Sequence, residues 1–132
     1  MMNKANNIIR IPTSLDSNFF RYWFLFLQPF HNLTKREIDV ITSFCKQRYL
    51  LSKVIKDEDI LDKVLMSEDT KKKIREECKI SLPHFQVILS NLRKSKVIVN
   101  GKINQKFIPN ITEDKGYFQL LLLFELKESN ND

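Results

Sequence analysis

Residues 80–98 read ISLPHFQVILSNLRKSKVI, and this stretch decides the fold that the sequence predicts. Ser81 is a small polar residue of the kind that caps helix N-termini, and Pro83 is tolerated in a first helical turn. Apolar residues then recur at helical spacing and predict a core-facing helix over residues 82–94. This stripe consists of Leu82, Phe85, Ile88, Leu89 and Leu92.

The pattern after this helix changes from helical to extended. Residues 97–99 are β-branched, and residues 102–109 form a second extended run. Asn100 and Gly101 lie between the two runs, and Asn-Gly is the strongest two-residue hairpin signal. We therefore expect a tight β-hairpin directly after the helix.

Upstream of residue 80, the sequence predicts two further helices and an inserted one. Thr34 and Glu37 have the spacing of a capping box, which predicts a helix over residues 34–49. Ser67 is an N-cap candidate for a helix over residues 69–78. The acidic residues 57–59 suit the first turn of an inserted helix over residues 58–66, because negative charge stabilises a helix N-terminus.

The two ends of the chain are expected to add strands and an aromatic helix. Residues 7–12 (NIIRIP) predict an edge strand, and an aromatic stripe around Trp23 predicts a helix that continues to about Gln28 and stops at Pro29. A short strand is also expected over residues 50–55. Residues 117–127 alternate and predict a strand that is buried on one side and partly on the other.

This order of elements resembles a winged helix-turn-helix domain, with residues 80–98 resembling its recognition helix and the start of its wing. The expected fold class is α+β: a winged helix-turn-helix core with an added N-terminal aromatic helix and terminal strands. The expected parts are residues 1–32 (strand and aromatic helix), 33–110 (winged helix-turn-helix), 111–127 (C-terminal strand) and 128–132 (disordered tail). More loosely, the whole chain resembles small helix-turn-helix proteins of crAss-like tailed phages, which implies a host cytoplasm or a virion as its setting.

Charge is unevenly distributed along the chain. Residues 67–110 carry ten Lys or Arg against four Asp or Glu, whereas residues 111–132 carry two against five. Between Cys78 and Thr112 there is no acidic residue. A basic run of this kind is commonly a solvated face, but here it coincides with the helix and hairpin that would face nucleic acid.

The resemblance implies that helix 82–94 lies in the major groove of duplex DNA, with the hairpin over the adjacent backbone. The side chains expected to face the bases are His84, Gln86, Val87, Ser90 and Asn91. Those expected to meet phosphates are Arg93, Lys94, Lys96, Lys102 and Lys106. No Arg lies in the middle of this outward face, so the same surface could instead dock a protein, as in a phage virion or assembly component.

An enzyme is not expected from these residues. His31 and His84 lie on different elements without spaced metal ligands, and two isolated glycines cannot build a phosphate-binding loop. We expect no metal, cofactor or small-molecule ligand. Cys45 and Cys78 are expected as reduced thiols, and the apolar runs are too short to span a membrane, which favours a cytoplasmic protein. The 117–126 strand is expected to pair with residues 7–12, with another subunit or with a partner protein.

Overall fold

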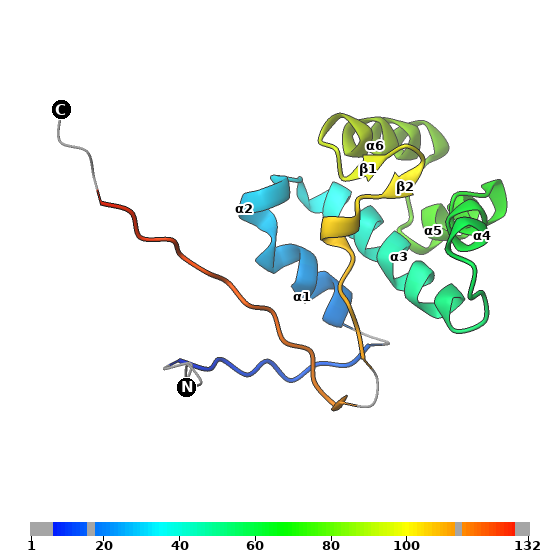
Figure 1. The fold of residues 1–132 in the computed structure, drawn as a ribbon. Coiled ribbons are helices and arrows are strands. Elements are labelled where there is room, and N and C mark those ends of the chain that lie inside the picture. Colours follow the sequence, from blue (N-terminus) through cyan, green and yellow to red (C-terminus); the bar gives the residue numbers. More distant parts are fainter. Residues whose placement is uncertain (1–6, 16–17, 113–114, 129–132) are drawn as a thin grey trace.

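Helices make up about half of the residues that the computed structural model describes, which are 7–15, 18–112 and 115–128 (Figure 1). The helices are α1 (Phe19–Phe26), α2 (Gln28–His31), α3 (Lys35–Ser52), α4 (Glu58–Leu65), α5 (Glu68–Glu77) and α6 (Leu82–Lys94). One two-stranded antiparallel sheet follows, formed by β1 (Ile98–Val99) and β2 (Lys102–Ile103), and then a 3-10 turn, η1 (Gln105–Phe107). The expected α+β class is confirmed at this level: the fold is mostly helical, with one small hairpin.

α3 is the central helix, and α1, α4, α5 and α6 all pack against it. It begins at the expected capping box, in which Thr34 Oγ1 accepts a hydrogen bond from Glu37 N at 3.3 Å and Thr34 N donates to Glu37 Oε1 at 3.0 Å. The strand expected over residues 50–55 is wrong, because α3 continues to Ser52. The Ile55 amide then donates a hydrogen bond back to the Leu51 carbonyl oxygen at 2.8 Å, so this segment turns at the end of α3 and does not form a strand.

The starts of α5 and α6 were located correctly by their caps, and α4 starts where the acidic residues 57–59 indicated. The side chains of Asp57, Ser67 and Ser81 accept hydrogen bonds at the starts of α4, α5 and α6. These bonds satisfy backbone N–H groups that have no partner inside the helix. The helix stop expected at Pro29 is wrong, since the chain bends at Leu27 and continues as α2, where Pro29 occupies the first turn and needs no N–H partner.

The hairpin has the expected turn but shorter strands. Ile98 pairs with Ile103 and Val99 pairs with Lys102. Asn100 and Gly101 have φ values of 54° and 71°, the left-handed conformations that a type I′ turn requires at both central positions. The second strand was expected to reach Pro109, but it ends at Ile103 because the chain turns into η1.

The core joins the aromatic helix to the rest of the molecule. Phe20 and Phe24 of α1 are fully buried, and Trp23 Nε1 donates to the Phe107 carbonyl oxygen at 2.8 Å. On the other side of α3, Phe85 of α6 stacks on Phe44 with ring centroids 6.3 Å apart. These contacts place α6 and the hairpin on the same core as α1.

The strands expected at residues 7–12 and 117–126 are wrong for the single chain. Both segments are extended, but neither belongs to a strand ladder among the described residues. A β-prone sequence needs a hydrogen-bonding neighbour to become a strand, and the described part of the chain supplies none here. Phe118 is partly buried, because its ring packs edge-on against Phe19 and Trp23. The other side chains of these two segments are exposed. Residues 129–132 of the expected tail lie outside the described residues.

Candidate nucleic-acid interface

One face of α6 is buried and the other is exposed, as its helical spacing predicts. Phe85, Ile88, Leu89 and Leu92 are buried against the core. Leu82, which was assigned to the same stripe, is half exposed because it is the first residue of the helix and lies at its open end. Of the ten side chains predicted to contact DNA, eight are exposed. They are His84, Gln86, Val87, Arg93, Lys94, Lys96, Lys102 and Lys106.

Asn91 is bonded within the fold, in contrast to the outward position expected for it. Its Nδ2 donates to Glu37 Oε2 of α3 at 3.0 Å, and the side chain is partly buried between the two helices. Ser90 is partly buried as well. The helical angle of Asn91 lies near the edge of the outward face, and the contact with α3 turns its amide inward. Of the five side chains expected to face the bases, His84, Gln86 and Val87 are exposed.

The junction between α6 and the hairpin is fixed by the backbone. Lys96 has a φ of 63°, the Val97 amide donates to the Leu92 carbonyl at 3.0 Å, and Asn104 Nδ2 donates to the Lys96 carbonyl at 2.9 Å. Because strand residues alternate, Ile98 and Ile103 face the core while Val99 and Lys102 face solvent. The hairpin therefore lies beside α6 (Figure 1). Lys102 on it is exposed.

Lys106 is placed differently from the other predicted cations. It lies in η1 instead of a hairpin strand, and its ammonium is 5.1 Å from the centre of the Phe107 ring. This cation–π contact directs Lys106 along η1, the turn that follows β2. Lys106 is exposed, but it lies outside the hairpin strands.

All charged side chains on α6 and the hairpin are basic. No acidic residue occurs between Cys78 and Thr112, so no carboxylate on α6 or the hairpin neutralises the lysines there. The first turns of α4 and α5 contain acidic residues, whereas the first turn of α6 contains none. The partial positive charge at the N-terminus of α6 is therefore not offset by side chains of its own first turn.

Lys79 is a cation that the site prediction missed. It is exposed and occupies the turn between α5 and α6 with a φ of 55°. Its position in the acid-free segment was visible in the sequence. The sequence does not show the backbone conformation of Lys79, which positions this residue just before the N-terminus of α6.

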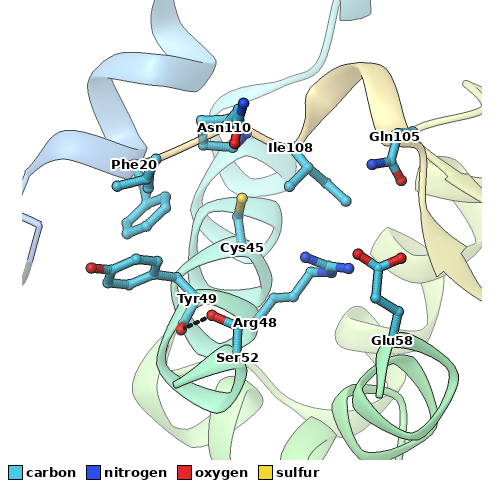
Figure 2. Close-up of a pocket in the computed structure, with 11 residues that line it drawn as sticks. Phe20, Cys45, Arg48, Tyr49, Ser52, Glu58, Gln105, Ile108 and Asn110 are labelled. Carbon is cyan, nitrogen blue, oxygen red and sulfur yellow. Dashed lines mark hydrogen bonds between the residues drawn. The ribbon is translucent and has the colours of Figure 1, made fainter. Parts of the chain in front are cut away.

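A separate cavity of about 500 Å³ borders α3 and the segment that follows β2 (Figure 2). It is lined by residues of α1, α3, the start of α4 and residues 105–111, and none of its lining residues belongs to α6 or the hairpin. Figure 2 shows the Arg48 guanidinium directed toward the Glu58 side of this cavity. Arg48 Nε also forms an ion pair with Asp62 Oδ1 at 3.4 Å, so its charge is already compensated.

The thiols and the buried histidine are placed for structure. Burial raises the pKa of the Cys45 thiol to about 12, and burial together with Glu77 and Asp39 raises the pKa of Cys78 to about 11. Both thiols are therefore protonated, and poorly nucleophilic, at neutral pH. His31 Nε2 contacts the Phe24 carbonyl oxygen at 2.7 Å and His31 Nδ1 accepts from Leu33 N at 3.0 Å, which ties α2 to α1.

Comparisons with known proteins give no relative: no protein-family model, curated protein or solved structure matches the chain. Within the described residues, no three His, Cys, Asp or Glu side chains are grouped so as to hold a metal ion. None of the helices in that part of the chain is sufficiently long and apolar to cross a membrane.

Proposed function

We propose that this protein is a DNA-binding protein of winged helix-turn-helix type, in which α5 and α6 are the helix-turn-helix and β1–β2 is the wing. It acts as a small regulator or as a replication or packaging accessory, without catalytic activity. The observation that carries the proposal is the exposed, acid-free face of α6 and the adjoining hairpin. That face combines the elements that enter or flank a major groove with cations able to meet phosphates.

The exposed side chains of α6 suggest limited sequence readout. Gln86 can pair with the N6 and N7 edge of adenine, and Val87, which is 56% exposed, can contact a thymine methyl group. Arg93 and Lys94 lie in the last turn of the helix, where they can reach the backbone and position the domain. Since Asn91 is bonded to Glu37, we expect phosphate contacts to supply most of the affinity.

The proposal is tested by removing two phosphate-facing cations. Lys94→Ala combined with Lys102→Ala should weaken binding to a random-sequence duplex. The slope of log K plotted against log salt concentration should become less steep by about one unit per lost phosphate contact. Fluorescence anisotropy of a labelled duplex over a salt series measures both effects. Lys56→Ala combined with Lys63→Ala removes the same charge near α4 and should leave the salt slope unchanged.

A second function is favoured by one specific observation. Leu82, Pro83 and Val87 form exposed apolar surface on α6, which suits a protein contact better than a phosphate backbone. This surface would serve a virion or assembly component that uses the same fold for docking. If the wild-type protein shows no salt-dependent retention on duplex DNA at low salt, the docking function replaces the DNA-binding one.

A further inference from the structure

One side of the cavity beside α3 is aromatic and uncharged (Figure 2). The rings of Phe20 and Tyr49 both line it, and their centroids are 5.7 Å apart. Cys45 also lines the cavity, and burial raises the pKa of its thiol to about 12, so this group is neutral at pH 7. The cavity volume of about 500 Å³ is in the range of small-molecule sites in proteins.

The other side of the cavity is polar and charged. Figure 2 shows Arg48, Glu58 and Gln105 on the opposite side of Cys45 from Phe20. Arg48 belongs to α3, Glu58 to the first turn of α4 and Gln105 to η1. Three elements that are separated in the sequence therefore bring a guanidinium, a carboxylate and an amide to one cavity.

Arg48 is held by one partner and keeps hydrogen-bond donors unused. Its side chain is only 13% exposed, and its Nε donates to Asp62 Oδ1 at 3.4 Å. Asp62 offsets the charge, but it is the only hydrogen-bond partner of the Arg48 side chain among the described residues. The Nη1 and Nη2 groups therefore lack an acceptor there. Because largely buried polar groups are normally hydrogen-bonded, these donors point to an acceptor that enters the cavity.

Glu58 faces the same cavity without pairing with Arg48. Within the part of the chain that the structure describes, Arg48 forms its ion pair with Asp62, and the Glu58 carboxylate forms none. The position of Glu58 in the first turn of α4 favours its ionised form, because the helix dipole stabilises negative charge there. A guanidinium and a carboxylate that line one cavity without touching leave space for a ligand that carries both charges.

The charges around the cavity decide between classes of ligand. Arg48, Asp62 and Glu58 together carry one net negative charge, so a ligand with only a carboxylate would add to an existing excess. A ligand with only an ammonium would leave the Nη groups of Arg48 without an acceptor. A zwitterion with a carboxylate next to an ammonium avoids both costs, because each of its charges meets an opposite one.

We propose that this cavity binds a free aromatic α-amino acid. The ligand carboxylate accepts hydrogen bonds from Arg48 Nη1 and Nη2, the ammonium donates to Glu58, and the aromatic side chain packs against Phe20 and Tyr49. Bidentate arginine–carboxylate contacts are strong and specific, and aromatic pairs add to the area that they bury. The site departs from the expectation that the chain binds no small-molecule ligand. It uses no residue of α6 or the hairpin, so it does not depend on the DNA-binding proposal.

The first test compares three compounds by isothermal titration calorimetry with the full chain. L-phenylalanine carries both charged groups, 3-phenylpropanoate lacks the ammonium, and 2-phenylethylamine lacks the carboxylate. L-phenylalanine should bind at least about tenfold more tightly than either analogue, because each analogue loses one charge-assisted contact. If L-phenylalanine does not bind at millimolar concentration, or if the three compounds bind equally, the proposal is wrong. Neither result bears on DNA binding.

The second test assigns the ammonium contact with two matched variants of α4. Glu58→Gln should weaken binding of L-phenylalanine by about tenfold and should not weaken binding of 3-phenylpropanoate, which has no ammonium. Asp59→Asn removes the neighbouring exposed carboxylate, which does not line the cavity, and should leave both affinities unchanged. Equal affinities of the two variants for L-phenylalanine overturn the assignment.

The third test concerns the carboxylate contact. Arg48→Lys keeps a positive charge beside Asp62 but removes the two Nη groups. It should weaken both L-phenylalanine and 3-phenylpropanoate by about tenfold, with an unchanged circular dichroism spectrum. A folded Arg48→Lys protein with wild-type affinity for both compounds contradicts the proposed site. If this variant does not fold, the Glu58 and Asp59 pair still decides the question.

Discussion

Glu37 shows how one side chain links the start of a helix to the placement of another helix. Its Oε1 accepts the Thr34 amide in the capping box, and its Oε2 accepts the Asn91 amide from α6. Glu37 is buried, and a buried carboxylate that loses a hydrogen-bond donor is costly. The orientation of α6 on α3 therefore depends on Asn91, which gives this residue a structural role.

This assignment of Asn91 predicts unequal effects on stability for two amide side chains of α6. Asn91→Ala should lower the free energy of unfolding by about 1–3 kcal/mol, because it leaves the Glu37 carboxylate short of a donor. Gln86→Ala, at an exposed position, should change stability by less than about 0.5 kcal/mol. Urea unfolding followed by circular dichroism measures both. Equal stability of Asn91→Ala and the wild type would contradict the role given to the Glu37 bond.

At the scale of elements, local chemistry predicts helix starts well and strands poorly. Thr34, Ser67 and Ser81 mark helices correctly because an N-cap acts on amides within three residues of it. Residues 7–12 and 117–126 have strand-like patterns, but a strand exists only when another segment completes its ladder. No local pattern contains that partner.

The candidate site, like the fold, was predicted from the sequence only in part. Helical spacing identified the outward face of α6 and its exposed cations, since that face follows from the periodicity of α6 alone. It failed at Asn91, whose partner Glu37 lies 54 residues away, and at Lys106, which a 3-10 turn removes from the hairpin. Contacts between distant segments determine both positions, and periodicity carries no information about them.

The hairpin turn provides a prediction for an element. Gly101 and Gly116 both have positive φ, at 71° and 69°, and a Cβ at either would meet no atom within 4 Å. Valine at either position is therefore strained without a clash, at a cost of about 1–2 kcal/mol. Gly101→Val should also lower affinity for duplex DNA, because it distorts the proposed wing. Gly116→Val, outside the wing, should not. Equal DNA affinities for the two variants would show that the hairpin does not contribute to DNA binding.

At the scale of the whole molecule, the basic and the apolar exposed surfaces are separate. The acid-free segment between residues 78 and 112 carries α6 and the hairpin, whereas the uncovered apolar segments leave from the start of α1 (Figure 1). Such a division permits the basic surface to bind a partner without involving the terminal segments.

The most direct test of the account is to map the residues that respond to DNA. Amide chemical shifts of ¹⁵N-labelled protein should be recorded at low salt during titration with a random-sequence duplex. The account predicts that shifts concentrate at residues 79–96 and 100–103, with little change in α4, and that added salt reverses them. A titration that leaves α6 and the hairpin unperturbed, or that shifts only α4, would contradict it.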